Sequence, residues 1–344
     1  MLLALFELDW SNDYRLLYAP SAATDLASAP AQANVSLTRL PLRERWQTIA
    51  WHRLRLPLWA DLAAGGVDVF HSPDFVLAPV RSARSIVTVH DLTFVVRPEC
   101  AAASLRRYLS RMVPRSVHRA DRVLADSKAT ADDLMRLYDV PAERLDVVYS
   151  AADPRFRPLP PAEAEALLAG LDVPRPFLLT VGTLEPRKNL SRLIDAFLSL
   201  DLPQQLVVVG ARGWLYGDLL AKLAQPRIVA PDHVSDDQLV ALYNLAEAFV
   251  YPSLYEGFGL PPLEAMACGV PVAVSNVSSL PEVVGQAGLT FEPEDTGAIA
   301  AAIRRLVDDA GLRAELRAAG PEQAANFSWE ASARQLKGIY ESLA

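Results

Sequence analysis

Tyr251–Ser275, YPSLYEGFGLPPLEAMACGVPVAVS, carries the clearest structural pattern of the sequence. The apolar run Ala248–Tyr251, whose last residue begins the stretch, is short enough for a buried strand. The β-branched residues at the end of the stretch, Val270–Ser275, suit a second strand. Pro261 and Pro262 suit a first helical turn, where a missing N–H costs nothing, and Gly269 suits the residue after a helix. The pattern therefore predicts a strand, a loop, a short helix and a second strand.

The loop of this unit predicts a binding site for phosphate. Gly257, Phe258, Gly259 and Leu260 lie where the loop passes into the first turn of the helix. Backbone N–H groups at such a turn attract anions, together with the positive end of the helix dipole. A diphosphate is the group that we expect there.

Two carboxylates, Glu256 and Glu264, flank the loop with residues 257–263 between them. A carboxylate suits a vicinal diol, because its oxygens accept hydrogen bonds from two hydroxyls at once, and it does not suit phosphate. We therefore assign Glu264 to a ribose and Glu256 to the hydroxyls of a sugar. The alternative for Glu264 is an acid that only stabilises the first turn of its helix.

The run EGFGLPPLEAMACGVPV at residues 256–272 resembles the E-x7-E signature of the retaining glycosyltransferases of family 4. The resemblance implies an α/β protein of the GT-B fold. Such a protein has two Rossmann-like, doubly wound domains, a cleft between them and a C-terminal helix that crosses back to the first domain. In that family the first Glu contacts the donor sugar, the second holds the ribose and the loop touches the diphosphate. These donor-binding roles would fall here on Glu256, on Glu264 and on Gly257, Phe258, Gly259 and Leu260.

The composition is that of a globular protein large enough for two domains. The chain has 344 residues, of which 51% are hydrophobic and 22% charged, and its formal net charge of −8 argues against nonspecific binding to nucleic acid. Cys100 and Cys268 are its only cysteines and predict a reducing compartment without disulfides. The five histidines show no metal-site spacing, so we expect no metal. We also expect no signal peptide and no membrane span.

Proline-rich segments at residues 153–161 and 172–176 predict a linker between domains. With the resemblance, we expect an acceptor-binding domain at 1–160, a nucleotide-sugar-binding domain at 161–328 and the crossing helix at 329–344. The chain opens on a stretch that resembles the family's first helix and second strand. The family's first strand and glycine-rich loop are therefore expected to be missing.

A second motif follows the strand predicted within residues 177–184, FLLTVGTL. Arg187 and Lys188 come after it, at the edge of the sheet where ligands bind, and two cations there can neutralise a diphosphate leaving group without a metal. By resemblance, Lys188 matches a family lysine, Gly182 is a donor-binding residue, and the loop ending at Val234 lies against the nucleotide base. The alternative is a turn whose charges are only solvated.

Two histidines end runs that read as strands, VDVFHSPD at 67–74 and SIVTVHDLTF at 85–94. In the family, the second His of an H-x-H pair in the first region contacts the donor sugar, but Pro73 stands at that position after His71. His90 and Asp91 resemble the HD pair of a mannosyltransferase-like subgroup, so we expect them to be catalytic. The alternative is that each His is a structural residue with its hydrogen bonds satisfied.

Two segments mix arginines with apolar residues. Residues 41–60, PLRERWQTIAWHRLRLPLWA, favour a helix that packs its Trp and Leu face inward, and the alternative is a membrane-surface or acceptor-binding segment. Arg107, Arg111, Arg115 and Arg119 repeat every four residues and would share one helical face, which Pro114 interrupts or kinks. A solvated basic face is favoured there, and contact with anionic lipid headgroups is the alternative.

The resemblance implies a retaining, metal-independent glycosyltransferase that moves a hexosyl group, with mannosyl favoured, in polysaccharide or glycolipid synthesis. Catalytic roles are expected for Glu256, His90, Asp91, Lys188 and Arg187. GDP-mannose is favoured over UDP-sugars as donor, a saccharide or lipid-linked molecule is the acceptor, and no cofactor is expected. The location is expected to be cytoplasmic, with peripheral contact to the inner membrane face left open. A donor-binding but inactive protein is the alternative, and the absence of a G-x-G-x-x-G motif argues against a dehydrogenase.

Overall fold

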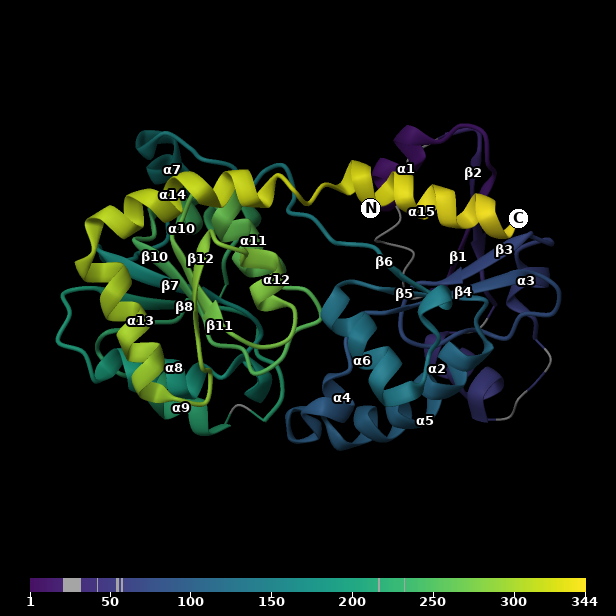
Figure 1. Ribbon diagram of the computed structural model, residues 1–344, viewed down its shortest axis with the longest axis horizontal. Coiled ribbons are helices and arrows are strands. Elements are labelled where there is room, and N and C mark those ends of the chain that lie inside the picture. The colour runs from purple at the N-terminus through teal and green to yellow at the C-terminus, as the bar shows by residue number, and fades with distance from the viewer. Residues whose placement is uncertain (21–31, 42, 54–55, 57, 216, 232) are drawn as a thin grey trace. The chain divides into compact units, whose positions relative to one another are not determined.

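The computed structural model describes residues 1–20, 32–41, 43–53, 56, 58–215, 217–231 and 233–344 (Figure 1). The first of two compact units holds Met1–Leu92, Arg107–Ser150 and Ser328–Ala344. The second holds Thr93–Arg106 and Ala151–Phe327. Relative to the expected ranges, the second unit begins at residue 151 rather than 161 and includes a segment from the sequence of the first.

The second unit is built on one sheet of six parallel strands in the order β12-β11-β10-β7-β8-β9. These strands are β7 (Phe177–Val181), β8 (Gln205–Val209), β9 (Ile228–Val229), β10 (Ala248–Tyr251), β11 (Val272–Ser275) and β12 (Gly288–Phe291). The strand order reverses between β7 and β10, which pair directly through Ala248 with Leu178 and Phe249 with Leu179. This reversal is the switch point of a doubly wound sheet, at whose carboxyl edge ligands bind.

Helices cover both faces of this sheet, and its central strands are buried accordingly. Figure 1 shows α8, α9 and α13 on one side and α7, α10 and α11 on the other. The helices are α4 (Thr93–Val96), α7 (Pro161–Leu167), α8 (Leu190–Leu198), α9 (Gly217–Leu223), α10 (Asp236–Leu245), α11 (Leu260–Ala267), α12 (Leu280–Val284), α13 (Thr296–Asp308) and α14 (Ala310–Ala324), with the 3₁₀ turns η4 (Pro98–Cys100) and η6 (Pro186–Lys188).

Helices α10 and α11 of the second unit begin at residues whose backbone and side chains favour a helix start. Ser235 caps α10 by accepting from the Gln238 N–H, and the Gln238 side chain accepts from the Ser235 N–H in return, which is a capping box. Helix α11 carries Pro261 and Pro262 in its first turn and ends before Gly269, whose φ is 74°. The strand, loop, helix and strand read from Tyr251–Ser275 are therefore β10, the loop, α11 and β11.

The first unit has a four-stranded parallel sheet, β3-β4-β5-β6, and a separate parallel pair, β1-β2. Its strands are β1 (Tyr14–Tyr18), β2 (Val35–Arg39), β3 (Val69–Ser72), β4 (Arg84–Val89), β5 (Arg122–Ala125) and β6 (Leu145–Val147). Its helices are α1 (Leu2–Leu8), α2 (Glu44–Thr48), the π-helical turn η3 (Ile49–Arg53), α3 (Ala60–Ala63), α5 (Ala103–Arg119, whose first turn belongs to the second unit), α6 (Lys128–Tyr138), the 3₁₀ turn η5 (Ala142–Arg144) and α15 (Trp329–Leu343). In the described part of this unit the strands of the larger sheet follow sequence order.

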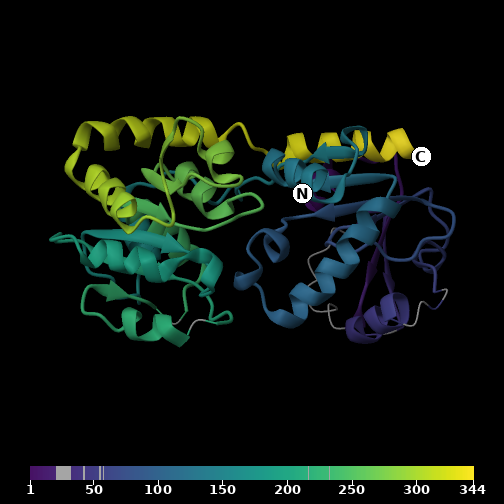
Figure 2. The same cartoon turned by 60° about the horizontal axis from the view of Figure 1, so that its bottom comes forward.

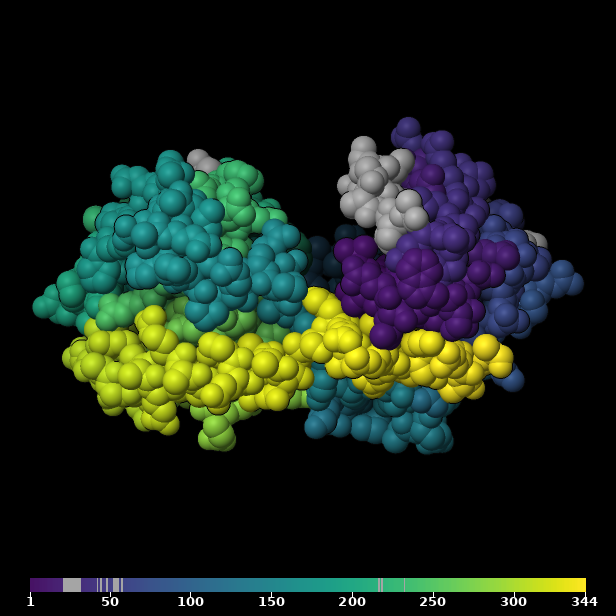
Figure 3. Space-filling model, turned by 90° about the horizontal axis from the view of Figure 1, so that it is seen from above, coloured from purple at the N-terminus to yellow at the C-terminus, as the bar shows by residue number. Residues whose placement is uncertain are grey.

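The last helix, α15, packs within the first unit, as the expected crossing helix would. Its residues Ala333, Leu336 and Ile339 join a core cluster that includes Leu5 of α1 and Ile86 of β4. The helix is also fixed by a hydrogen bond from the Ser332 hydroxyl to the Tyr149 carbonyl oxygen, at 2.6 Å. Figures 1 and 3 show α15 in yellow alongside α1 in purple.

Three expectations for the first unit differ from the structure in whole or in part. His71 lies inside β3 rather than at its end. Pro114 does not interrupt α5, which runs on to Arg119 as one long blue helix in Figure 2, and a kink at Pro114 stays a prediction. The inward-facing arrangement of the segment 41–60 fails at three large apolar side chains: Trp46 is 59% exposed, Leu56 43% and Leu58 46%. In the described parts of the chain, no helix has the length and apolar character that crossing a bilayer requires.

Gly210, at the end of β8, leaves no room for a side chain, because an added Cβ would lie 1.9 Å from the Gly182 carbonyl oxygen. We expect Gly210→Ala to lower the free energy of unfolding by about 2 kcal/mol or more, since backbone has to move. Urea unfolding measures the loss. Gly217→Ala is the matched control, because nothing lies within 4 Å of its added Cβ. Equal stability of the two variants would contradict this packing.

Candidate active site

The candidate site lies at the carboxyl ends of β7 and β10, where the strand order reverses. The turn η6 follows β7, and a loop that contains Glu256 follows β10. Asn189, directly after η6, ties these loops together: its side-chain amide donates to the carbonyl oxygens of Pro252, at 3.0 Å, and Pro293, at 2.7 Å. The segments that follow β7, β10 and β12 are thus held as one framework.

Glu256 is the centre of the site. Its Oε1 accepts hydrogen bonds from Lys188 Nζ at 2.6 Å, the Ser253 hydroxyl at 2.5 Å and the Tyr251 hydroxyl at 2.9 Å. Its Oε2 pairs with Arg187. Glu256 is only 7% exposed, so both of the cations predicted for the diphosphate converge on this carboxylate.

The ionised form of Glu256 is strongly favoured. Burial alone would raise the pKa of its carboxyl, but the charges of Lys188 and Arg187 and the hydrogen bonds outweigh burial and lower the pKa to about 2. Burial lowers the pKa of Lys188, and the attraction to Glu256 opposes that change. The carboxylate therefore acts as a hydrogen-bond acceptor only, throughout the physiological pH range.

Glu185 is a second carboxylate of the site, and it pairs with Arg187 at 2.8 Å. Its side chain is buried, and its Oε2 has no hydrogen-bond partner among the described residues. Lys188 Nζ donates to Tyr251 and Glu256. Its third N–H therefore has no acceptor among the residues that the structure describes. The cluster thus balances two cations with two carboxylates and keeps unused donor and acceptor capacity.

The loop after Glu256 is shaped by serines from the β11–α12 connection. The Ser278 hydroxyl accepts from the Glu256 N–H at 2.9 Å, and the Ser279 hydroxyl donates to the carbonyl oxygen of Phe258 at 2.6 Å. Gly259 has φ 122°, and an added Cβ would lie 2.9 Å from Leu280, so only glycine fits there. The loop enters α11 in a fixed conformation, with Leu260 as the first helical residue.

Glu264 has an environment opposite to that of Glu256. Its Oε2 accepts a hydrogen bond from the buried Tyr243 hydroxyl at 2.9 Å. Burial raises the pKa of Glu264 to about 7, with the charges of Asp153 and Asp236 adding to the rise and Tyr243 and Arg155 opposing it. The favoured role of Glu264 as a ribose ligand stays a prediction. The alternative, an acid that only stabilises the first turn of its helix, is wrong, because Glu264 lies in the second turn of α11 and is partly buried.

In the first unit, His90 and Asp126 follow the neighbouring strands β4 and β5 at one edge of the sheet. His90 Nδ1 lies 2.8 Å from Asp126 Oδ2. This hydrogen bond raises the pKa of His90, and burial opposes the rise. His71 is instead structural: it bonds to the hydroxyls of Tyr340 and Thr88, and burial lowers its pKa to about 4.

Comparisons with known proteins show the family of the chain. Residues 14–156 match the family "Glycosyltransferase Family 4", and residues 169–323 match "Glycosyl transferases group 1". The chain is 38% identical over 285 residues to the O-antigen chain mannosyltransferase B of Escherichia coli, covering 80% of this chain and 74% of that protein. The chain belongs to glycosyltransferase family 4. It is a glycosyltransferase, and its relatives give no support to the alternative of an inactive donor-binding protein.

Solved structures establish the GT-B fold of this glycosyltransferase. A glycosyltransferase from Rickettsia africae superposes with a TM-score of 0.77 at 18% identity, over 99% of this chain and 93% of that chain. Anabaena HepE, solved in complex with UDP-glucose, gives a TM-score of 0.73 at 17% identity, over 95% of this chain and 99% of that chain. Because the sequence identities are so low, the likeness to these two structures is evidence for the fold alone.

The structure brings part of the predicted site together. Arg187, Lys188 and Glu256 form one cluster, and Gly182 lies under the Lys188 side chain, whose Cδ would be 3.3 Å from a Cβ added at Gly182. His90 and Asp91 belong to the other unit. Val234 lies just before the cap of α10, and Asp232 of the same loop falls outside the described residues.

The sequence did not identify five residues that make polar contacts with the predicted site residues Arg187, Glu256, Glu264 and His90. They are Glu185, Tyr251, Ser253, Tyr243 and Asp126. Glu185, Ser253 and Asp126 each follow a predicted strand directly or within a few residues, which was a usable signal. Tyr251 and Tyr243 read as core residues of a strand and a helix, so only the tertiary packing reveals their roles.

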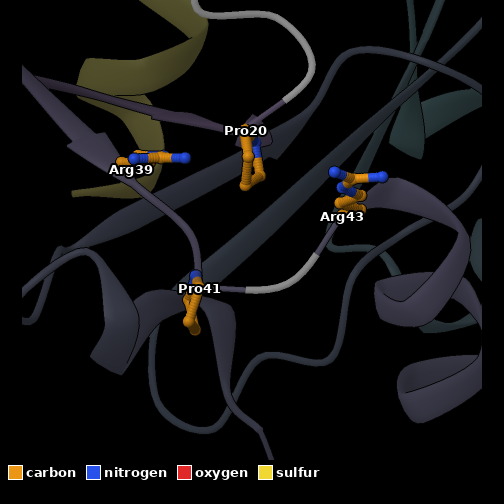
Figure 4. A pocket seen from close by; sticks show the side chains of 4 residues that line it. All are labelled: Pro20, Arg39, Pro41 and Arg43. Atoms are coloured by element: carbon orange, nitrogen blue, oxygen red, sulfur yellow. The ribbon is translucent and has the colours of Figure 1, made fainter.

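A separate pocket of about 400 Å³ lies at the carboxyl ends of β1 and β2 in the first unit. Pro20, Arg39, Pro41 and Arg43 line it, and Figure 4 shows the two arginines on opposite sides with the prolines between them. None of the described residues that line it is a carboxylate. The pocket therefore offers positive charge at the ligand-binding edge of this strand pair.

The raised pKa of Glu264 predicts a pH-dependent stability. Because the folded protein holds this proton up to about pH 7 and the ordinary value is 4.5, wild-type stability falls as pH rises between these values. The side chain of Glu264→Gln does not ionise, so the stability of this variant does not fall over the same pH range. We expect the variant to exceed wild type by about 1–3 kcal/mol above pH 7 and to match it below pH 4.5 in urea unfolding. Glu322→Gln, on the exposed part of α14, is the control. A constant difference across pH would contradict the buried, protonated carboxyl.

Proposed function

We propose that this glycosyltransferase moves a mannosyl group from GDP-mannose to a saccharide or lipid-linked acceptor, with retention at the anomeric carbon. The observation that carries the proposal is the cluster of Arg187, Lys188 and Glu256 at the switch point of the second unit. The 38% identity to an O-antigen chain mannosyltransferase supports the choice of sugar and the class of acceptor.

The diphosphate leaving group is assigned to Arg187 and Lys188. When the bond from the sugar C1 to the phosphate oxygen breaks, the electron pair stays on that oxygen, and preorganised cations stabilise the developing charge. The unused N–H of Lys188 is available for a phosphate oxygen without disturbing its bond to Glu256. The acceptor hydroxyl then bonds to C1 on the same face, and its proton passes to the departing phosphate.

Glu256 and Glu264 are assigned to the sugar and the ribose of the donor. The low pKa of Glu256 keeps its oxygens as acceptors for sugar hydroxyls. The carboxyl of Glu264, with its pKa of about 7, gains hydroxyl donors from a bound ribose, which favour its ionised form. Gly182, the loop Gly257–Leu260 and Val234 complete the proposed donor contacts.

His90 is assigned to the transition state as a hydrogen-bond donor, with Asp126 as the residue that positions it and favours its protonated form by raising its pKa. Asp91 follows as the second member of the pair. We further propose that the enzyme works in the cytoplasm, where both of its cysteines stay free, and that it reaches its acceptor at the membrane face. No cofactor or metal is proposed.

A donor screen tests the proposal. We expect the protein to turn over GDP-mannose in preference to GDP-glucose, UDP-glucose and UDP-galactose, measured as release of the nucleoside diphosphate. Lys188→Met is expected to lower kcat by about 100-fold or more, because it removes a donor to the leaving group. Lys222→Met, which removes a partly exposed lysine paired with Asp195 away from the site, is the matched control. Preference for a UDP-sugar would contradict GDP-mannose as the donor. Full activity of Lys188→Met would contradict the assignment of the leaving group to this site.

Asp126→Asn separates the positioning role from a structural one. Since the bond to Asp126 is what raises the pKa of His90, the variant should move the alkaline limb of the kcat/KM profile to lower pH. The titration of His90 by NMR should move in the same direction. Asp132→Asn, on the exposed face of α6, is the control. A lower rate with an unmoved pH profile would contradict the role given to Asp126.

A further inference from the structure

We propose that Phe75 is a positioning residue for His90, and that a strained turn of the first unit is kept because it presents the Phe75 ring to His90. The inference rests on the proposed role of His90 in the transition state. Phe75 follows β3, and His90 follows the neighbouring strand β4. The centroids of the two rings are 5.4 Å apart and their planes are at 81°, which is the T-shaped arrangement that aromatic pairs prefer.

Phe75 lies at the centre of a tight turn that few residues adopt. The Val76 N–H donates to the carbonyl oxygen of Asp74 at 2.5 Å, which closes a three-residue γ-turn, and the φ of Phe75 is 51°. A γ-turn with positive φ is the rare and strained form, and a bulky side chain adds to the strain. Glycine adopts such an angle without a steric cost. Phenylalanine at this position is therefore explained by what its ring contacts and not by the turn.

The surrounding structure holds the turn in its strained conformation. The Phe75 N–H donates to the carbonyl oxygen of Thr88 at 2.8 Å, on β4 and two residues before His90. On the other side of the turn, the Leu77 N–H donates to the Ser116 hydroxyl of α5 at 3.0 Å. Strained backbone that several contacts keep in place is typical of functional sites. Here the contacts fix the turn to the strand that carries His90.

His90 is held by hydrogen bonds as well as by Phe75. Because a carboxylate only accepts, His90 Nδ1–H donates to Asp126, at 2.8 Å. The backbone of Pro73, in the segment that leads into the turn, also hydrogen-bonds the ring and adds to the rise in the pKa of His90. An imidazole has a broad range of rotation about its ring torsion. The Phe75 ring packs against the imidazole and narrows that range.

Removal of the Phe75 ring would change the packing of His90 and leave the charges around it in place. The acidic groups that act on His90 are Asp126, after β5, and Asp74, in the turn. The charge of His90 acts in turn on His71, in β3. Phe75 is uncharged, and the proposed donor contacts all belong to the second unit. Loss of the ring is therefore expected to lower kcat and to leave the KM for the donor unchanged.

A double-mutant cycle on the full chain tests whether Phe75 acts through His90. Phe75→Leu keeps a large apolar side chain and removes the ring. It should lower the kcat of GDP release from GDP-mannose about three- to tenfold, which is the contribution of one aromatic pair, with KM within about twofold of wild type. In His90→Ala, the same change should lower kcat no further. Wild-type kcat in Phe75→Leu, or an equal further loss in His90→Ala, would overturn the inference.

Urea unfolding tests the strain of the turn. Phe75→Gly and Phe75→Ala both remove the ring and should both lower kcat, but only glycine relieves the positive φ, so Phe75→Gly should unfold at the higher urea concentration. The opposite order would contradict a strained turn. Asp139 is the matched control, because its φ is 50° at the exposed end of α6, away from His90. Asp139→Gly and Asp139→Ala should unfold in the same order and keep wild-type kcat, and an equal loss of kcat there would contradict the link to His90.

A measurement without substrate separates this inference from the proposed function. In protein labelled with ¹⁵N-histidine, the ring N–H of His90 that donates to Asp126 should exchange with water about threefold faster or more in Phe75→Leu than in wild type. Faster exchange, together with wild-type protein that does not turn over GDP-mannose, would count against the donor and leave the role of Phe75 standing. Turnover of GDP-mannose with unchanged exchange would support the donor and overturn the role of Phe75.

Discussion

The buried ion cluster of Glu256, Lys188 and Arg187 is the interaction on which the site depends. Burying a carboxylate and two cations is costly, and their mutual attraction offsets that cost only where the remaining hydrogen bonds are made. Tyr251 and Ser253 make those bonds to Glu256. Removing one member of such a cluster leaves an unpaired buried charge, at a cost of about 3–5 kcal/mol. A cluster of this kind contributes little net stability, so its place at the switch point is better explained by ligand binding.

The cluster also explains how the two acids of one short motif come to differ. Glu256 meets two cations and has its pKa lowered to about 2, whereas Glu264 meets a tyrosine hydroxyl in a buried place and has its pKa raised to about 7. Environment rather than residue type sets these values, which suits one acid to a permanently ionised role and the other to a protonation state that a ligand can change. The cations, for their part, are held in position by Glu256 and Glu185, so the proposed diphosphate would bind with little reorganisation.

Local patterns predicted much of the fold. Prolines 261 and 262, Gly269 and Ser235 mark helix ends through backbone geometry and caps, so the elements around them could be read from the sequence. The hydrogen-bond partners of the two glutamates could not be predicted in the same way. Contacts between elements that are distant in the sequence decide which side chains donate to Glu256, and why Tyr243 donates to Glu264. The exposure of Trp46 and Leu56 was missed for the same reason, since amphipathic periodicity does not say whether a partner covers the apolar face.

A crystal structure of the protein with a bound nucleoside diphosphate tests the central claim most directly. The account predicts phosphate oxygens within hydrogen-bond distance of Lys188 and Arg187, and ribose hydroxyls on Glu264. A nucleotide bound at another edge of the second unit, with Glu256 still closed off by its cations, would contradict it.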